Sequence, residues 1–148
     1  MTPDAMPPDR ATKSSPFSLV ITIAPADIDA LGHVNNVVYL RWAQDVAAAH
    51  WLGAATADEH ASITWIAVRH EIDYLHAALP GDEIVARTWV GLAEAVRFER
   101  QVEIVRAADG KVLARARTLW CPVRRDTGRI TRVSATLRDR FSTGPADA

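Results

Sequence analysis

The sequence predicts an α+β domain in which a curled antiparallel sheet of five to six strands wraps around one long helix. Residues 37–52 form a single long run of helical spacing, and so few of its side chains are polar that most of this helix should be buried. One segment before it and four or five after it alternate apolar and polar residues with a period of two. Because loops cannot cover a lone buried helix, the sheet must curve around it.

The length of 148 residues, with 49% hydrophobic and 24% charged residues, suits one globular domain. We expect this domain over residues 16–141, between flexible tails at 1–15 and 142–148. No run reaches the roughly 18 apolar residues of a membrane span, and the N-terminus has no apolar core like that of a signal peptide. The single cysteine, Cys121, excludes an intrachain disulfide, so a reducing, cytoplasmic location is expected.

Each element follows from a local signal. A strand over 17–24 should end at Pro25, and Gly53 is a plausible end for the helix. Residues 54–62 resemble a mixed loop. A helix over 134–141 should be capped by Ser134. The remaining segments that alternate with a period of two are expected to be strands: 63–74, 83–91, 96–105, 111–123 and a short 130–133.

Charge is unevenly distributed along the chain. Residues 1–96 carry 5 Lys and Arg against 12 Asp and Glu, whereas 97–148 carry 12 against 6. The basic half could attract a phosphate-bearing ligand, or its arginines could pair with acids of the first half across the sheet. Arg41 and Asp45, four residues apart on the helix, could pair as well. No basic cluster is interleaved with exposed aromatic residues, so nucleic-acid binding is not expected.

The junction between the first strand and the long helix carries the densest polar chemistry. Asn35 or Asn36 can cap the helix, and the free N–H groups there stabilise negative charge together with the helix dipole. Asp27, Asp29 and His33 lie just upstream and are candidates for an acid, a base or a nucleophile. A purely structural capped turn contains the same residue types, so this chemistry alone leaves both interpretations open.

Residues 27–39 read DIDALGHVNNVVY and precede a helix rich in small residues that contains tryptophan. This pattern resembles the 4-hydroxybenzoyl-CoA thioesterase family, a branch of the hotdog-fold acyl-CoA thioesterases. The resemblance covers about residues 18–141, although beyond the motif it lies in the layout of the elements. It implies a hotdog fold and hydrolysis of an acyl-CoA to a free acid and CoA, with no cofactor.

The resemblance also assigns roles. Asp29 matches the carboxylate that attacks the thioester or activates water, and the backbone N–H near Asn36 matches the oxyanion donor. Asp27 is expected to hold the turn. His33 either takes part in catalysis or orients the loop; some plant-type acyl-ACP thioesterases pair such a histidine with an asparagine where this chain has Leu31.

Asn35 and Tyr39 are the expected substrate-binding residues, although Tyr39 could equally pack in the core. A further hotdog branch uses a glutamate on the main helix, but residues 37–52 contain none. The five histidines show no ligand spacing with nearby Cys or Glu, so no metal site is expected.

Hotdog proteins pair their sheets edge to edge, which implies a homodimer or homotetramer here. The expected partner is an acyl-CoA substrate, with the basic half receiving the CoA phosphates. Two alternatives stay open from the sequence. One is a non-catalytic hotdog protein that binds acyl-CoA, and the other is a hotdog hydratase or dehydratase, which needs a different Asp/His pairing.

Overall fold

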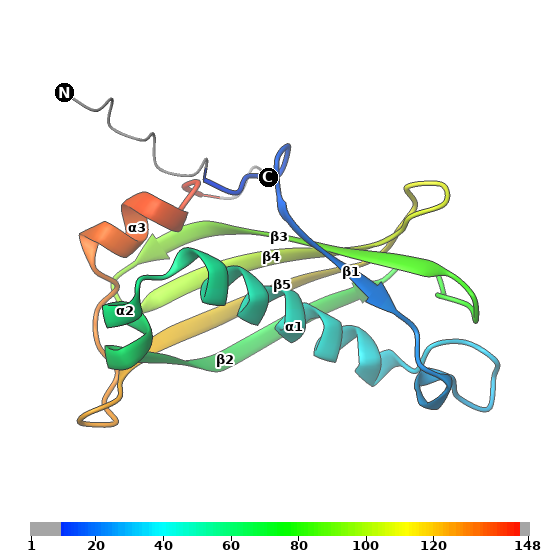
Figure 1. Ribbon diagram of the computed structural model, residues 1–148, viewed down its shortest axis with the longest axis horizontal. Helices are drawn as coiled ribbons and strands as arrows, with labels where there is room; N and C mark the ends of the chain where they lie inside the picture. The colour runs from blue at the N-terminus through cyan, green and yellow to red at the C-terminus, as the bar shows by residue number, and fades with distance from the viewer. Residues whose placement is uncertain (1–9, 146–148) are drawn as a thin grey trace.

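The structure, a computed structural model, describes residues 10–145 and shows five antiparallel strands with helices on one side (Figure 1). The strands lie in the order β1-β3-β4-β5-β2, and every neighbouring pair is antiparallel. This confirms the predicted α+β class. In chain order the elements are β1 (Phe17–Thr22), the short 3-10 helix η1 (Pro25–Asp27), α1 (Asn36–Ala54), α2 (Ala57–Ser62), β2 (Ile63–Tyr74), β3 (Glu83–Glu94), β4 (Arg97–Arg106), β5 (Val112–Arg124) and α3 (Ala135–Phe141).

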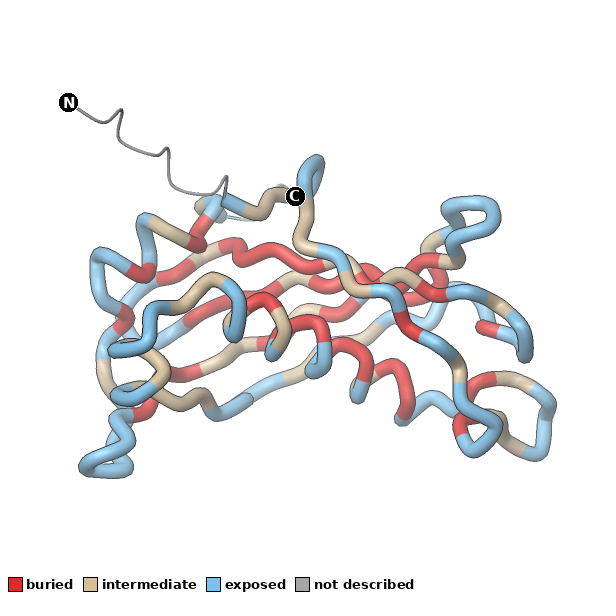
Figure 2. Tube along the Cα trace, in the orientation of Figure 1, coloured by how far each residue is buried: buried red, intermediate tan, exposed pale blue. Residues whose placement is uncertain are grey.

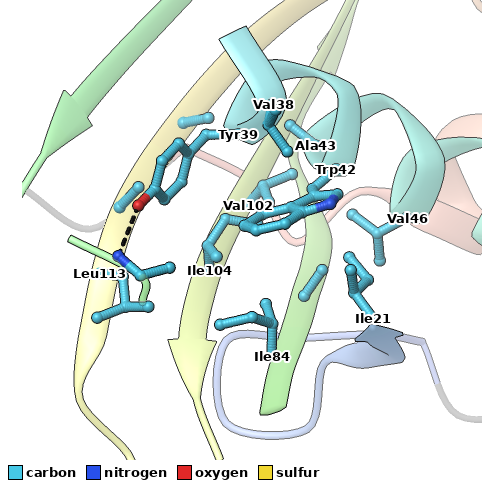
Figure 3. Close-up of a cluster of buried hydrophobic side chains, with 14 of the residues drawn as sticks. Ile21, Val38, Tyr39, Trp42, Ala43, Val46, Ile84, Val102, Ile104 and Leu113 are labelled. Atoms are coloured by element: carbon cyan, nitrogen blue, oxygen red, sulfur yellow. Dashed lines mark hydrogen bonds between the residues drawn. The ribbon is translucent and has the colours of Figure 1, made fainter. Parts of the chain in front are cut away.

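The long helix α1 lies across the concave face of the sheet and buries its apolar side there (Figures 1 and 2). Trp42 is 1% exposed and lies among aliphatic side chains of the sheet, including Ile84 and Ile104 (Figure 3). The small side chains of Ala43 and Ala47 allow the helix to approach the strands closely. Truncating a buried tryptophan to alanine typically costs about 3–5 kcal/mol, so Trp42 is a principal anchor of the fold.

A second core cluster lies at the other end of α1, beneath α3. Phe98 and Phe141 are both 2% exposed, and their ring centroids are 5.6 Å apart. Trp51 of α1, Trp65 of β2 and Trp120 of β5 pack against this cluster and are only partly buried. The two halves of α1 therefore contact different surroundings: aliphatic residues near its start and aromatic residues near its end.

Strand β2 is an edge strand, because only β5 pairs with it. Its 12 residues include the exposed apolar side chains Ile66 and Val68, and a register shift lies between Ala67 and Arg69. Much of the strand is pale blue in Figure 2, in contrast to the red strands in the middle of the sheet. A long edge with exposed apolar residues is a site at which another strand can pair.

Several predicted boundaries were wrong. Gly53 does not end α1, because the helix continues to Ala54 and the N–H of Ala55 still donates to Trp51 O at 3.0 Å. Residues 54–62 are not a loop, because α2 forms there. Thr56 and Glu59 stabilise its start, each side chain accepting from the backbone N–H of the other.

The segment 130–133 joins the sheet through an isolated bridge between Ile130 and Val123 and does not form a strand, so the described sheet has five strands and not six. The prediction for α3 was confirmed, since the Ser134 hydroxyl oxygen accepts from Leu137 N at 3.1 Å.

Parts of the two expected tails lie within the described residues. Ser142 is buried and its hydroxyl donates to Gly91 O at 2.7 Å, while Thr143 N donates to Val90 O at 3.0 Å. The chain just after α3 is thus attached to β3. Near the other end, Thr12 and Ser15 close a small turn. The rest of the two expected tails, 1–9 and 146–148, lies outside the described residues.

Arginines of the second half of the chain form ion pairs with acids of both halves, as Arg117 does with Glu99 and Glu71. Arg117 lies 2.7 Å from Glu99, and Arg115 lies 3.2 Å from Glu103. These pairs join neighbouring strands on the face of the sheet away from α1. They account for part of the basic excess without any ligand.

Candidate functional site at the two ends of helix α1

Asp27 fixes the loop that leads into α1. It is 3% exposed, and its Oδ2 accepts from Ala24 N at 2.9 Å. Its Oδ1 accepts from Arg41 Nη2 at 2.8 Å, and its backbone carbonyl accepts from Asn35 N at 2.9 Å. The hydrogen bond from the Arg41 guanidinium holds the pKa of Asp27 below its usual value. Arg41 therefore reaches back to the loop, and the expected pair with Asp45 does not form.

Asp29 lies in a tight chain reversal. Its N–H donates to His33 O at 2.9 Å, and its carbonyl accepts from Gly32 N at 3.0 Å. Gly32 has a φ of +81°, a left-handed conformation that glycine adopts without strain. The Oδ1 of Asp29 accepts from Leu31 N at 2.9 Å. Its Oδ2 has no hydrogen bond to another described residue, so one oxygen of this half-buried carboxylate is available for chemistry.

Asn35 caps α1, and of the two residues that the sequence offered as the cap, Asn36 is instead the first residue of the helix. Its side-chain oxygen accepts from Val37 N, and its carbonyl accepts from Val38 N, both at 3.0 Å. The N–H of Asn36 has no acceptor in the described part of the chain, while its carbonyl accepts from the Tyr74 hydroxyl at 3.1 Å. The start of α1 therefore offers an unused backbone donor, strengthened by the helix dipole, in the same loop as Asp29.

His33 and Tyr39 occupy different surroundings. His33 is half-buried, and its ring makes no hydrogen bond to another described residue. Tyr39 is 3% exposed, and its hydroxyl oxygen accepts from Ala78 N at 2.8 Å. Its ring packs edge-on against Trp42, with centroids 5.3 Å apart (Figure 3), and burial raises the pKa of its hydroxyl. Tyr39 thus lies in the core and joins α1 to the turn before β3.

A cavity of about 200 Å³ lies beside the second half of α1. Four aromatic side chains form much of its wall, together with small helix residues and two arginines, and no Asp or Glu is among its lining residues. The lining comprises Gln44, Ala47, Ala48, Trp51, Thr64, Trp65, Phe98, Arg100, Trp120 and Arg125.

Arg100 is the most unusual residue of this cavity, because its side chain is charged and only 3% of it is exposed. Its Nη1 donates to His50 Nδ1 at 2.9 Å and to Thr88 Oγ1 at 3.1 Å. Burial lowers the pKa of Arg100 to about 9 and that of His50 to about 4. At neutral pH the arginine is therefore charged, and the neutral imidazole serves as its acceptor.

Sequence reasoning did not identify the cavity residues as a site. One available signal was that Arg100 interrupts the apolar face of its strand. The aromatic residues lie far apart in the chain, and only the strand order β4-β5-β2 brings Phe98, Trp120 and Trp65 beside Trp51 of α1.

The two regions are separate within one chain. Two cavity residues of α1, Gln44 and Trp51, lie eight and fifteen residues after Asn36. At 1.5 Å per residue, these separations correspond to roughly 12 and 22 Å along the helix. A group bound in the cavity is thus far from Asp29 of the same chain.

Within residues 10–145, no group of three or more His, Cys, Asp or Glu is arranged to hold a metal ion. None of the helices that the structure describes is long and apolar enough to cross a membrane.

Comparison with known protein families shows to which family this chain belongs. The family model for the thioesterase-like superfamily matches residues 23–141, which include the loop, α1 and the whole sheet except β1. The chain belongs to the thioesterase-like superfamily. The resemblance inferred from residues 27–39 is therefore confirmed at the level of the family. No curated protein matches the chain.

Solved structures of thioesterases share the fold of this superfamily member. The dynemicin thioesterase is 20% identical, with a TM-score of 0.76 over 86% of this chain and 98% of its own. A thioesterase from Thermus thermophilus, complexed with coenzyme A and Zn, is 21% identical, with a TM-score of 0.73 over 84% and 90%. The 1,4-dihydroxy-2-naphthoyl-CoA thioesterase of Synechocystis is 20% identical, with a TM-score of 0.69 over 80% and 89%. These likenesses establish the hotdog fold.

Proposed function

We propose that the protein is an acyl-CoA thioesterase that hydrolyses its substrate to a free acid and CoA. The observation that carries this proposal is the loop before α1. It combines a half-buried Asp29 carboxylate, which has one oxygen without a hydrogen bond, and the unused N–H of Asn36 at the helix N-terminus. Membership of the thioesterase-like superfamily supports the reaction type.

The chemistry follows from these two groups. Asp29 takes a proton from water as the water oxygen attacks the thioester carbonyl carbon, or it attacks that carbon itself and water then hydrolyses the resulting anhydride. The Asn36 N–H donates to the carbonyl oxygen as negative charge develops there. In the water route the C–S bond breaks after water has added to the carbonyl carbon, whereas in the anhydride route it breaks as the anhydride forms, before water attacks. In both routes the CoA thiolate leaves and takes up a proton. His33 and the amide of Asn35 border this loop and would orient the substrate.

The site is completed by a second copy of the chain. Helix α1 and strand β2 run in opposite directions: Tyr74 donates to Asn36 O at one end, and the rings of Trp51 and Trp65 are 5.3 Å apart at the other. If β2 pairs antiparallel with β2 of a second copy, the two-fold axis brings the partner's Asp29 loop beside this chain's cavity.

The exposed Ile66 and Val68 on β2 and the exposed Ala48 on α1 would be covered by this pairing. We therefore expect a homodimer, which could associate further into a tetramer, with acyl-CoA bound between the two copies. Exposed arginines of the second half of the chain would face the CoA phosphates.

The test is thiol release from a panel of acyl-CoAs by the wild type and by Asp29→Asn. Loss of a general acid or base typically lowers kcat by about 10² to 10⁴, and we expect a fall in this range. Asp139→Asn, at an exposed position on α3, is the matched control and should keep wild-type turnover. Unchanged turnover in a folded Asp29→Asn dimer would exclude the proposed role. Binding without turnover would instead indicate a non-catalytic protein, and hydration of an enoyl-CoA would indicate a hydratase.

A further inference from the structure

The aromatic cavity beside α1 contains a positive charge that no acid of the described chain neutralises. Arg100 is 3% exposed, and no Asp or Glu in the described part lies within ion-pair distance of it. Its hydrogen bonds go to a neutral histidine and a hydroxyl. A buried charge without a counter-charge destabilises the folded state, so packing alone does not explain an arginine at this position.

The geometry of its hydrogen bonds shows which part of the guanidinium is unused. A guanidinium has five N–H donors, and Nη1 supplies the bonds to both His50 and Thr88. The Thr88 hydroxyl donates onward to Gln101 O at 2.8 Å, so it can only accept from Arg100. The edge formed by Nε and Nη2 makes no hydrogen bond to another described residue. Two parallel N–H groups on one edge match the two oxygens of a carboxylate.

In the rest of the lining, only Gln44 and Thr64 have side-chain acceptors, and both side chains are donors as well. The indole nitrogens of Trp65 and Trp120 are buried without a hydrogen-bond partner among the described residues. Phe98 lies below the guanidinium, with its ring centroid 5.8 Å from the Arg100 Cζ. Donors therefore outnumber acceptors in an otherwise apolar, aromatic surrounding, which favours a planar group that carries an anionic oxygen.

We propose that this cavity binds the acyl part of the substrate, and that Arg100 selects an aromatic acyl group that bears a carboxylate at the end away from the thioester. The assignment of the bound group as an acyl part rests on the proposed thioesterase function. Size agrees, since a cavity near 150 Å³ holds a benzene ring and this cavity of about 200 Å³ adds room for a carboxylate.

The test compares two probes of the same shape by calorimetry: 4-carbamoylbenzoate, whose amide stands in for the thioester end, and terephthalamide, in which a second neutral amide replaces the carboxylate. We expect the wild type to bind 4-carbamoylbenzoate about 10- to 100-fold more tightly, as is typical of a buried hydrogen-bonded charge. Arg100→Met should abolish this preference, and Arg100→Lys should retain only part of it. Arg97→Met, an exposed arginine on the same strand, should leave it unchanged.

Equal affinity of the wild type for the two probes would overturn the inference, whether or not the Arg100 variants fold. So would a preference that survives in a folded Arg100→Met protein. Turnover of 4-carboxybenzoyl-CoA and 4-carbamoylbenzoyl-CoA separates this inference from the function on which it rests. Hydrolysis of both at the same rate would retain the thioesterase and reject the selectivity. Selective binding of 4-carbamoylbenzoate over terephthalamide, without hydrolysis of any acyl-CoA, would retain the carboxylate site and reject the thioesterase.

Discussion

The two ends of α1 differ in the residues that surround them. At the start of the helix, the loop is polar and local in sequence, and backbone hydrogen bonds hold Asp29 within a few residues of its partners. At the far end, aromatic side chains from α1, β2, β4 and β5 line a half-open cavity beside a buried arginine. The first end presents a half-buried carboxylate and an unused backbone donor, whereas the second is a half-open, largely apolar space lined by two arginines, one of them buried.

On the proposed function, this difference separates chemistry from recognition. Substitutions in the loop should alter kcat, because the groups there would act on the reacting atoms. Substitutions around the cavity should alter which acyl group is accepted. Since about 12 to 22 Å of helix lies between the two ends in one chain, they can act on one substrate only if a second copy supplies one of them.

The larger stability effect is expected at the cavity end, from His50. Its pKa is lowered to about 4 in the folded protein from an ordinary value of 6.5, because it is buried next to Arg100. Below pH 6.5 the His50 imidazole therefore binds a proton in the unfolded chain, whereas in the folded protein it does so only below about pH 4. The contribution of neutral His50 to the free energy of unfolding is complete above pH 6.5. As the pH falls toward 4, the protein loses about 2 to 3 kcal/mol of this free energy.

Urea unfolding of the wild type and of His50→Gln between pH 4 and pH 7 would check this expectation. Glutamine keeps an acceptor for Arg100 but does not titrate. The wild type should lose more stability than the variant over this range. Parallel curves for the two proteins would show that His50 is charged in the folded state or does not sense the arginine.

A smaller effect is expected at the loop end, from Arg41→Met. The substitution leaves the buried Asp27 carboxylate without its guanidinium partner, but Arg41 itself is about half exposed. We expect a loss of about 1 to 2 kcal/mol. Because the folded pKa of Asp27 is lowered, this contribution is present above the ordinary value of 3.8 and disappears as the pH falls through the lowered pKa.

The measurement is urea unfolding at neutral pH and in acid. The difference between the wild type and Arg41→Met should shrink in acid. Asp45→Asn is the control, because Asp45 makes no ion pair with Arg41, and it should match the wild type. Equal losses from both substitutions would mean that Arg41 pairs along the helix after all.

The loop was predictable from sequence because its determinants are short-range. The cap at Asn35 and the turn at Gly32 each depend on residues within about four positions. The cap of α3 at Ser134 was predictable for the same reason. The same reasoning could have found α2, since Thr56 and Glu59 have the spacing of a capping box, but that segment lacks apolar periodicity.

Contacts between residues far apart in the sequence could not be predicted from local patterns. Arg41 pairs with Asp27 and not with Asp45, because the loop folds back onto the helix and offers a buried carboxylate. The cavity depends on which strands become neighbours, and nothing local to Arg100 or Trp120 specifies this. Gly53 continues the helix, which shows that a glycine alone does not end one when the chain beyond it still hydrogen-bonds.

The most direct test of the central claim, that Asp29 of one copy serves the cavity of another, is complementation in mixed dimers. Asp29→Asn removes the carboxylate, and Gln44→Trp fills the cavity from an exposed position on α1; each protein alone should be dimeric by light scattering and nearly inactive. A mixed dimer retains one intact site, formed by Asp29 of the second variant and the cavity of the first. Random mixing should therefore restore about a quarter of wild-type thiol release. No activity above that of the parents, in a sample shown to contain mixed dimers, would place the whole site within one chain and contradict the account.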